Sequence, residues 1–580
     1  MRGGGVDLFS LAPRPVFAPT LDSRRRAVFL KAYQSKVNVD LITPPSLEEV
    51  AKSLKLTHDT SPGPDGVSFA AWRAAPDLAA TVLWDALRAV LNGQLPPEGF
   101  NHGLLFLLPK KLTGLIADTR PLSVTNTDNR ILAACVARCI MGAVDDYVHP
   151  SQKGFVAGRQ GADHVSDINE RFYEAVKKKE NKLLFLLDTA KAFDSIDHDW
   201  VSHVLVKVGF PPWFRNFVRG SLSSVKVAPF FGAELTEWID IERGVKQGCP
   251  LSPLLFVIAY DPLLVYIAGL TEVELFAFAD DLALFADSVP LISKALLEIT
   301  RFSEVSGLGV NRDKSVAVPT GDPSLWGAIK EELKSCPWPS LPLSDKGTHL
   351  GILIGREVTL GQLWAGPTAK AEARLRQNKT LIASLPLSSR MLYINVFIVS
   401  LFSYIALFFI LPEELWKSIR ELIRRFFPFN GGAYFMDELV CARQLYGVKP
   451  PLKDVWAFNI SLLAVRSKFF PDCAIKYSDL PLIDVRYNMS IKDHRDCAAV
   501  DFWMFSHEED GTLVPPSPPT SSQVYKILVK GVYEGKATAR LGKKVHDFVK
   551  EKQPNPPPPT FSSSLSTIIL VSFFSRPSAF

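Results

Sequence analysis

Two short apolar runs in the middle of the chain each lead directly into aspartate, and this pattern constrains the fold more than any other feature. Leu183–Leu187 reads LLFLL and precedes Asp188, while Glu274–Ala279 reads ELFAFA and precedes the pair Asp280 and Asp281. Runs of this length that are apolar throughout are typical of strands buried on both faces. A further apolar stretch, LALFA, follows the aspartate pair at once. The pair is therefore predicted to lie in a tight turn between two strands.

These three carboxylates suggest a metal site. Aspartate is common at strand ends and in turns, so each cluster alone is compatible with ordinary turn chemistry. Asp188, Asp280 and Asp281 on the tips of neighbouring strands would instead form an all-oxygen site of the kind that Mg²⁺ prefers. Such a site can hold two ions about 3.5–4 Å apart, one activating an attacking hydroxyl and one stabilising the leaving oxygen. That is the chemistry of nucleotide addition, and Mn²⁺ is an expected substitute for Mg²⁺.

The rest of the pattern indicates an α+β fold. Ser46 followed by Glu49 forms a capping box that predicts the start of a helix. The Pro and Gly residues of Ser61–Gly66 predict a tight loop, and GLLFLLPKK predicts a strand that ends on Lys110 and Lys111. The segments NRILAACVARCIMGAV, SPLLFVIAYDPLLVYI and PLISKALLEITRFSEV have helical character. Strands and helices therefore alternate in the middle of the chain.

Length and composition set wide bounds. A chain of 580 residues is long enough for more than one core. Its net charge of +5 is compatible with a polyanionic partner but would not by itself indicate nucleic acid. The seven cysteines are scattered, with no C-x-x-C pair, and the N-terminus lacks an apolar signal segment. The chain is therefore expected to be intracellular.

One segment raises the question of a membrane. Met391–Leu411 carries no charge and is long enough to cross a bilayer as a helix. Asn395, Ser400 and Ser403 interrupt it, and the basic, amphipathic EELWKSIRELIRRFF follows. A buried helix is therefore favoured over a membrane span, and no stable membrane association is expected.

Several motifs, in a fixed order, resemble those of reverse transcriptases from non-LTR (LINE-like) retrotransposons. LDTAKAFD with Asp188 is similar to the first polymerase motif, RGVKQGCPLSPLLF to the second and FADD to the third. FSEVSGLGVNRDKS and THLGILIG are similar to the fourth and fifth. Upstream, SPGPDG, LLPKK, DTRPLSVTN and SQKGFVAGR resemble finger motifs of the same family. The resemblance covers roughly residues 46–470.

The resemblance implies a right-hand polymerase fold of fingers, palm and thumb. Its palm would be a small antiparallel sheet packed on helices in the split βαβ manner. A poorly structured C-terminal region would follow, since its Pro-rich stretches cannot pack a core. The expected divisions are an N-terminal extension, fingers, palm, thumb or connection, and a partly disordered C-terminal region, at residues 1–45, 46–170, 171–345, 346–470 and 471–580.

The resemblance also implies roles for residues around the carboxylates. Phe193 corresponds to the aromatic steric gate that rejects a 2′ hydroxyl, although it could be an ordinary core residue. Gln247 and Gly248 correspond to the turn that borders the incoming nucleotide and the template.

Three cations also have implied roles. Arg120 corresponds to the finger arginine that meets the triphosphate, with Lys110 beside it. For the loop lysine a solvated basic position is the alternative. Lys314 corresponds to a lysine that donates a proton to departing pyrophosphate.

Two basic helices downstream resemble thumb helices that hold template and primer. Their side chains would contact the nucleic-acid backbone without regard to sequence. The alternative is that many are ordinary solvent-facing positions. The candidates are Lys370, Arg374, Arg376, Arg420, Arg424 and Arg425.

The resemblance thus implies an RNA-directed DNA polymerase that extends a primer by a two-metal mechanism. Its partners would be an RNA template, a DNA primer or target and deoxynucleoside triphosphates, and the family's chromosomal target implies nuclear action. No endonuclease is evident, since residues 1–45 are too short and Cys473 and Cys497 lack knuckle spacing. The alternatives are a catalytically silent, degenerate RNA-binding remnant of a retroelement and a group II intron maturase-like protein.

Overall fold

The computed structural model describes most of the chain up to residue 462. The chain divides into two compact units, Met1–Arg356 and Glu357–Phe580. The predictions for Lys111 and for most of residues 1–22 and 471–580 lie outside the described residues, and the predicted domain boundaries stay predictions. The described residues are 23–34, 36–110, 115–231, 234–270, 272–429, 432–433, 439–442, 449–459, 461–462, 507–509, 512–514 and 525.

The two apolar runs form strands of a four-stranded sheet in the first unit, β3 (Leu183–Thr189) in its centre and β7 (Glu274–Phe278) at its edge. Its strands lie in the order β7, β8 (Asp281–Ala286), β3 and β9 (Val310–Pro319). Every neighbouring pair is antiparallel. The predicted strands and the small antiparallel sheet are therefore confirmed. Burial on both faces is confirmed for β3 but is wrong for β7, which is an edge strand with only Ala277 buried.

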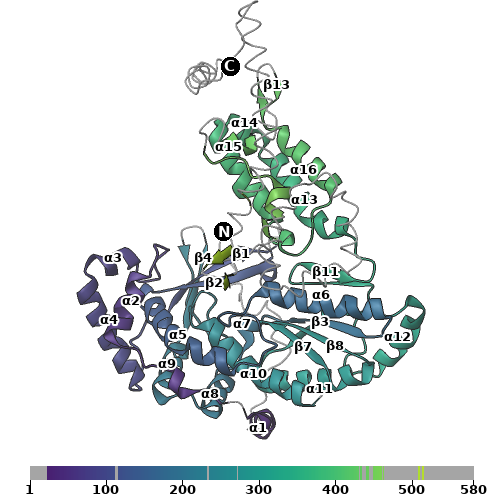
Figure 1. Cartoon of the computed structure of the whole chain (residues 1–580). Helices are drawn as coiled ribbons and strands as arrows, with labels where there is room; N and C mark the ends of the chain where they lie inside the picture. The colour runs from purple at the N-terminus through teal and green to yellow at the C-terminus, as the bar shows by residue number, and fades with distance from the viewer. Residues whose placement is uncertain are drawn as a thin grey trace, which may run out of the picture. The chain divides into compact units, whose positions relative to one another are not determined.

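Strand β3 is apolar throughout because both faces of the sheet are covered. Phe185 and Leu187 belong to the main core, which includes residues of α10 (Ser252–Leu270) and α11 (Val289–Ser306). Leu186 points to the opposite face, where a Cβ on Gly347 would come within 2.6 Å of its Cδ1 atom. Figure 1 shows α10 and α11 below the sheet and α6 above it.

The remaining strands and helices of the first unit frame this sheet. A second sheet has the order β2-β1-β4-β5, in which β1 and β4 are parallel and β6 pairs with β4. The strand predicted from GLLFLLPKK is confirmed as β1. The strands are β1 (Gly103–Pro109), β2 (Thr119–Thr125), β4 (Lys226–Phe231), β5 (Glu234–Leu235), β6 (Ile239–Asp240), β10 (Lys346–His349) and β11 (Ile352–Gly355). The helices are α1 (Ser23–Ala32), α2 (Leu47–Lys55), α3 (Phe69–Ala74), α4 (Pro76–Leu91), α5 (Thr127–Tyr147), α6 (Gly161–Lys178), α7 (Ala192–Ser195), α8 (His198–Val208), α9 (Pro212–Leu222) and α12 (Trp326–Lys334), with short 3₁₀ turns at Val39–Leu41, Ile116–Asp118 and Pro323–Leu325.

Local signals in the first part of the chain act as predicted. The Ser46 hydroxyl accepts a hydrogen bond from the Glu49 backbone N–H at 3.2 Å, which caps the start of α2. In the tight loop, Gly66 adopts a φ of 72° and its N–H donates to the Gly63 carbonyl. The start of the helix and the loop are both confirmed.

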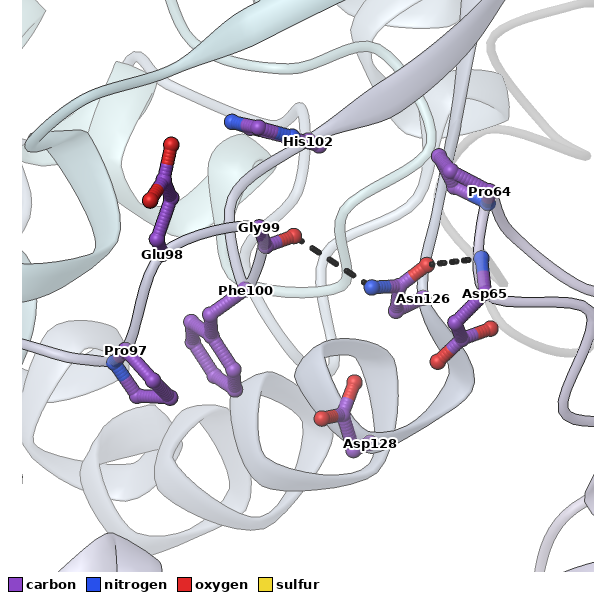
Figure 2. A pocket seen from close by; sticks show the side chains of 9 residues that line it. All are labelled: Pro64, Asp65, Pro97, Glu98, Gly99, Phe100, His102, Asn126 and Asp128. Atoms are coloured by element: carbon purple, nitrogen blue, oxygen red, sulfur yellow. Dashed lines mark hydrogen bonds between the residues drawn. The ribbon is translucent and has the colours of Figure 1, made fainter.

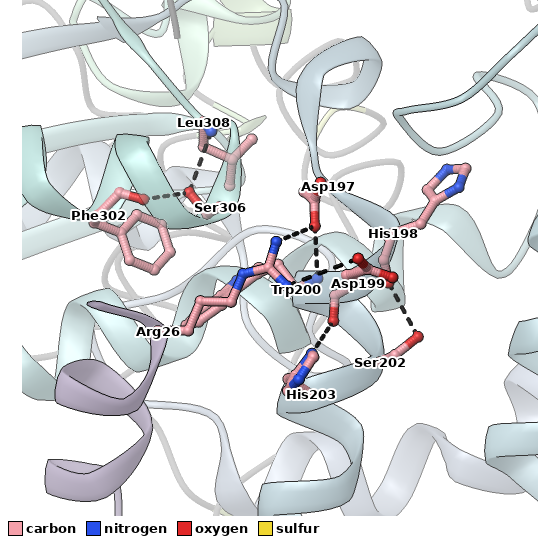
Figure 3. A network of polar contacts seen from close by, with 10 residues as sticks. All are labelled: Arg26, Asp197, His198, Asp199, Trp200, Ser202, His203, Phe302, Ser306 and Leu308. Atoms are coloured by element: carbon pink, nitrogen blue, oxygen red, sulfur yellow. Dashed lines mark hydrogen bonds and ion pairs between the residues drawn. The ribbon is translucent and has the colours of Figure 1, made fainter. Parts of the chain in front are cut away.

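Asp197, which follows β3 along the chain, has a structural role. The Asp197 carboxylate accepts from the Trp200 backbone N–H at 2.8 Å and from the Arg26 guanidinium at 3.3 Å (Figure 3). Its own N–H donates to the Ser306 carbonyl. A Cβ on Gly307, at φ 79°, would lie 2.3 Å from the Ser195 carbonyl oxygen. Asp197 is therefore a helix cap that ties α8 to α1 and α11.

The second unit is helical in its described part. It contains α13 (Leu360–Gln377), α14 (Lys379–Ser384), α15 (Leu387–Tyr393) and α16 (Glu413–Arg424). The short strand pairs β12 (Pro428–Phe429) with β13 (Gly432–Ala433) and β14 (His507–Glu509) with β15 (Thr512–Val514) complete it.

The single helix predicted over Met391–Leu411 is wrong, although much of this segment is buried. After α15 the chain passes through a π-helical turn at Ile394–Ile398 and 3₁₀ turns at Val399–Phe402 and Ile405–Leu407. The polar residues explain the break, because the hydroxyls of Ser400 and Ser403 bond to backbone carbonyls of the preceding turn.

Asn395 fixes the same segment to a distant part of the second unit. Its side-chain amide donates to the Pro451 carbonyl at 2.8 Å and accepts from the Lys453 N–H at 2.7 Å. By length and composition, the described part of the chain contains one helix able to cross a membrane, α10, and 67% of its most apolar window is buried within the structure.

We expect Trp200 to be a major contributor to the stability of the first unit. Its ring is fully buried, packs edge-on against Phe302 and donates from the indole N–H to the Ala259 carbonyl at 2.9 Å. Trp200→Ala should lower the free energy of unfolding by about 3–5 kcal/mol, measured by urea denaturation of the full chain. Val206→Ala is the matched control on the exposed side of α8 and should change it by less than about 0.5 kcal/mol. Equal losses would contradict the assignment of Trp200 to the core.

Candidate active site

The three aspartates selected from the sequence are brought together by strand pairing. Leu187 of β3 pairs with Leu282 of β8, so the next residue of β3, Asp188, lies beside Asp281, the first residue of β8. Asp280 lies in the turn, and the Thr189 hydroxyl donates to its backbone carbonyl at 2.6 Å. One edge of the sheet therefore carries all three carboxylates, as predicted.

These carboxylates repel one another in the absence of a cation. Burial, then the charges of Asp280 and Asp188, raise the pKa of Asp281 to about 6. Burial and the charge of Asp188 also raise the pKa of Asp280, while the nearby charge of Lys110 lowers it. A nearby like charge disfavours the ionised form of each carboxyl group, and a bound cation would offset that cost.

The donor atoms suit a hard cation, although they are not drawn into a closed ligand set. Only carboxylate oxygens are offered, which are the ligands that Mg²⁺ and Mn²⁺ take. Within the described ranges, no three His, Cys, Asp or Glu side chains converge closely enough to hold a metal ion.

Lys314 reaches the same edge of the sheet from β9. Its ammonium Nζ lies 3.6 Å from the Asp188 Oδ2 atom, and its side chain is 69% exposed. The pairing of β3 with β9 shifts register between Leu186 and Asp188, and the Asp188 N–H donates to the Ser315 hydroxyl at 3.2 Å. Bulges of this kind re-aim side chains at active sites.

Phe193 is half-buried on the short helix α7, which follows β3 along the chain. Its ring stacks on Phe256 with centroids 5.0 Å apart and an interplanar angle of 16°. The ring of Phe155 meets it edge-on at 5.8 Å. Phe155 is 44% exposed and has a φ of 58°. Phe193 thus packs on the core without being enclosed by it, which is compatible with a gate position.

The loop that contains Gln247 and Gly248 is tied to β2 and to α7. The Gln247 side-chain amide donates to the Asp194 carboxylate at 3.1 Å. The Gln247 backbone carbonyl accepts from the Ser123 N–H at 3.0 Å. Gly248 adopts a φ of 116°, and a Cβ there would lie 2.7 Å from the Ser123 carbonyl oxygen. Glycine is therefore required where this loop crosses β2.

Sequence reasoning missed Lys246, the residue before Gln247. Its side chain is buried and donates to the Asn101 side-chain oxygen at 3.0 Å. Burial lowers its pKa to about 8. The signal was its position inside the RGVKQG motif, which by itself does not distinguish a buried lysine from an exposed one.

The two finger cations lie on neighbouring backbone segments. Arg120 of β2 is paired with Leu108 of β1, and the Lys110 N–H donates to the Asp118 carbonyl at 2.8 Å. Both side chains are exposed. Of the two, Lys110 is within electrostatic reach of Asp280.

The turn before Asp280 is held by Gln152, which sequence reasoning also missed. The Gln152 side chain accepts from the Ala279 N–H at 2.7 Å and donates to the Ala279 carbonyl at 3.1 Å. Gln152 is completely buried. The motif SQKGFVAGR contained this residue, but nothing in the sequence connects it with a turn 127 positions away.

The six basic residues of the second unit differ in how far their charges are already paired. Lys370, Arg374 and Arg376 are exposed on α13, although the Arg374 guanidinium donates to the Phe397 carbonyl at 2.9 Å. Arg420 instead forms an ion pair at 3.2 Å with the buried Asp454 and lies over the Trp416 ring. Arg420 is therefore the weakest candidate of the six for a phosphate contact.

Arg424 and Arg425 share one carboxylate on α16. The Arg424 guanidinium makes two hydrogen bonds to Glu421, at 2.7 and 2.8 Å, and the Arg425 Nε lies 4.0 Å from the same carboxylate. The Arg424 side chain is 42% exposed and that of Arg425 is 68% exposed. Exposed ion pairs of this kind are weak, so a phosphate could compete for either guanidinium.

A pocket elsewhere in the first unit is lined by the acidic residues Asp65, Glu98 and Asp128, whereas a phosphate site would be lined by basic residues (Figure 2). The Asn126 side chain links its walls by accepting from the Asp65 N–H and donating to the Gly99 carbonyl. The pocket lies at the start of β1, whereas Lys110 follows the end of that strand. Its lining residues are Pro64, Asp65, Pro97, Glu98, Gly99, Phe100, His102, Asn126 and Asp128.

Comparison with known proteins identifies the region that contains this site. Residues 108–341 match a family described as "Reverse transcriptase (RNA-dependent DNA polymerase)". That range includes the three aspartates, Phe193, Gln247 and Lys314.

The chain is also similar to proteins of known retrotransposons. It is 27% identical over 381 residues to the transposon TX1 uncharacterized 149 kDa protein of Xenopus laevis, covering 62% of this chain and 28% of that protein. It is 32% identical over 214 residues to the Pol polyprotein of type-1 retrotransposable element R2 from Popillia japonica, covering 34% of this chain and 29% of that protein. The Pol polyprotein of element R2DM from Drosophila melanogaster is 27% identical over 318 residues, covering 53% of this chain and 30% of that protein.

The chain thus spans less than a third of the length of these relatives. Among solved structures, apo telomerase from Candida tropicalis truncated from its C-terminal domain aligns with a TM-score of 0.33 and 14% identity, covering 47% of this chain and 57% of that one. A TM-score at this level is too low to bear on the fold. The match of residues 108–341 and the similarity to R2 and TX1 proteins show that the chain carries a reverse transcriptase domain related to those of non-LTR retrotransposons.

Proposed function

We propose that this chain is an RNA-directed DNA polymerase of a non-LTR retroelement that adds deoxynucleotides to a primer 3′ end. The observation that carries the proposal is that strand pairing places Asp188, Asp280 and Asp281 at the same end of neighbouring strands inside a reverse transcriptase domain. A reverse transcriptase needs divalent cations, a template, a primer and deoxynucleoside triphosphates, and the same domain offers residues suited to the cations and the nucleotide.

The three aspartates would hold two Mg²⁺ ions, with Mn²⁺ as a substitute. When bound, the ions would activate the primer hydroxyl and stabilise the charge on the departing pyrophosphate. Their repulsion in the metal-free protein supports this role, because two cations would neutralise it. Lys314 stands beside Asp188 and would give its proton to the leaving pyrophosphate oxygen.

The incoming nucleotide would be held by residues from several elements around the carboxylates. The exposed cations Arg120 and Lys110 would contact the triphosphate. Phe193 would lie under the sugar, where a 2′ hydroxyl would meet its ring. Gln247 and Gly248 would border the base and the template. Gly248 supports this placement because its loop approaches β2 too closely for a side chain.

The RNA template and the DNA primer or target would contact basic side chains of the second unit. Lys370, Arg374, Arg376, Arg424 and Arg425 would meet phosphates, which makes binding independent of sequence and sensitive to salt. A polymerase that primes on chromosomal DNA would act in the nucleus.

Removal of the paired aspartates should abolish synthesis. The Asp280→Asn, Asp281→Asn double variant should lose several orders of magnitude in extension of a DNA primer on an RNA template with Mg²⁺. The control is Asp287→Asn at the opposite end of β8, where an exposed carboxylate pairs with Lys182. The control should retain activity. A native chain that binds template and primer without incorporation would instead indicate a silent remnant.

The burial of Asp281 and its repulsion by Asp280 and Asp188 predict a gain in stability when Asp281 is neutralised. In the metal-free protein the pKa of Asp281 rises from 3.8 to about 6, so its ionisation costs the folded state stability as pH increases through this window. The side chain introduced by Asp281→Asn cannot ionise. Above pH 6 the free energy of unfolding of this variant, measured by urea denaturation, should therefore exceed that of the native chain by about 1–3 kcal/mol. Near pH 4 the two proteins should converge. A variant less stable at every pH would argue against repulsion at this site.

The steric gate can be tested by shortening Phe193. Phe193→Val should admit a 2′ hydroxyl and raise the use of ribonucleotides relative to deoxynucleotides by about 10–200-fold, the range expected for a change in pocket volume. The ratio of kcat/KM for the two substrates in single-nucleotide extension measures it. An unchanged ratio in a folded, active variant would identify Phe193 as an ordinary core residue.

A further inference from the structure

The turn between β7 and β8 adopts a conformation that its own residues do not favour. Ala279 has a φ of 55°, in the left-handed region that non-glycine residues rarely adopt. Phe278 pairs with Asp281, so Ala279 and Asp280 are the two central residues of the hairpin turn. Tight turns of this type usually place Gly, Asn or Asp at such positions. Something outside the hairpin must therefore stabilise the Ala279 conformation.

That stabilisation comes from a single buried side chain. The Gln152 Oε1 atom accepts from the Ala279 N–H at 2.7 Å and from the Gly154 N–H at 2.9 Å. Its Nε2 donates to the Ala279 carbonyl at 3.1 Å. Both polar groups of the Ala279 backbone are thus bound by one carboxamide, and the carbonyl belongs to the peptide that joins Ala279 to Asp280.

The segment around Gln152 lies against the end of β7. The Lys153 N–H donates to the Ala277 carbonyl at 2.8 Å, and the Ala277 N–H donates to the Ser151 carbonyl at 3.0 Å. A Cβ on Gly154 would lie 2.2 Å from the Ala279 nitrogen, so only glycine allows this approach. The residues before and after Gln152 therefore both pack closely against the end of β7 and the turn that follows it.

Arg159 anchors this segment to the end of α5. Its guanidinium donates to the carbonyls of Gln152 and His149, each at 2.8 Å. It also donates to the carbonyls of Asp145 and Val148, at 2.9 and 3.0 Å. Four backbone carbonyls are thus gathered by one rigid side chain, which gives Gln152 a fixed base from which to hold the turn.

We propose that Gln152 is a positioning residue that fixes the Ala279 peptide and so directs Asp280 and Asp281 toward Asp188. The inference rests on the proposed polymerase function and adds the element that keeps the carboxylates together. The Gln152 carboxamide holds the turn through its backbone, without touching the reacting atoms.

Two variants test this role by independent routes. Gln152→Leu keeps the side-chain volume but removes the three hydrogen bonds, while Gly154→Ala presses on the Ala279 nitrogen and leaves Gln152 in place. Each should lower kcat by about tenfold to a hundredfold, the loss expected when reacting groups are misplaced. The affinity for template and primer should not change, and the Mg²⁺ concentration for half-maximal rate should increase.

The matched control is Asn216→Ala, which removes another side-chain hydrogen bond to the backbone. Asn216 donates to the Leu91 carbonyl at 2.9 Å, between α9 and the end of α4. This control should lower the melting temperature while leaving the Mg²⁺ requirement unchanged. Gln152→Leu and Gly154→Ala should differ from it by changing the metal requirement even where their melting temperatures match.

Two readouts separate this inference from the proposed function. Hydrogen exchange at the Ala279 amide should accelerate in Gln152→Leu, and the affinity for Mn²⁺ alone, measured by calorimetry, should fall. Both can be measured if the native chain synthesises no DNA, in which case the proposed function fails alone. Native exchange and Mn²⁺ affinity in folded Gln152→Leu would overturn the inference. If that variant does not fold, the same result with Gly154→Ala would overturn it.

Discussion

The antiparallel pairing of β3 with β8 is the interaction on which the first unit depends. Five residue pairs, from Leu183 with Ala286 to Leu187 with Leu282, join two strands that lie between helices on one face and further structure on the other. Burial of both faces stabilises the sheet, and the register decides which residues emerge at its edge. Asp188 and Asp281 are neighbours because of this register. The core and the candidate active site therefore both depend on the pairing of β3 with β8.

The same edge concentrates negative charge in a partly buried place, which stability alone would not favour. Active sites often retain such unfavourable groups because their function needs them. Here the surrounding structure compensates in two ways. Ser315 and the bulge in β9 set the direction of Asp188, and Gln152 holds the turn before Asp280.

Much of the fold could be predicted from the sequence because its signals are local. Leu183–Leu187 is apolar at every position, which identifies a strand covered on both faces, and antiparallel pairing then brings the aspartates together. The interruption of Met391–Leu411 could not be predicted from hydropathy, since it depends on side-chain bonds to the backbone. Two further contacts could not be predicted because their partners are distant in sequence. These are the ion pair of Arg420 with Asp454 and the hydrogen bonds of Gln152 with Ala279.

The hydrogen bonds from Gln152 to the turn at Ala279 also bear on how the first unit folds. Gln152 and Ala279 are 127 positions apart, so their hydrogen bonds form only after the chain between them has been ordered. Closing so long a loop is entropically costly and slow compared with local helix formation. The FADD motif can therefore form a hairpin early, whereas its final geometry arises late, when α5 and the Arg159 anchor are in place. The geometry of the candidate active site would then be reached only when folding of the first unit is complete.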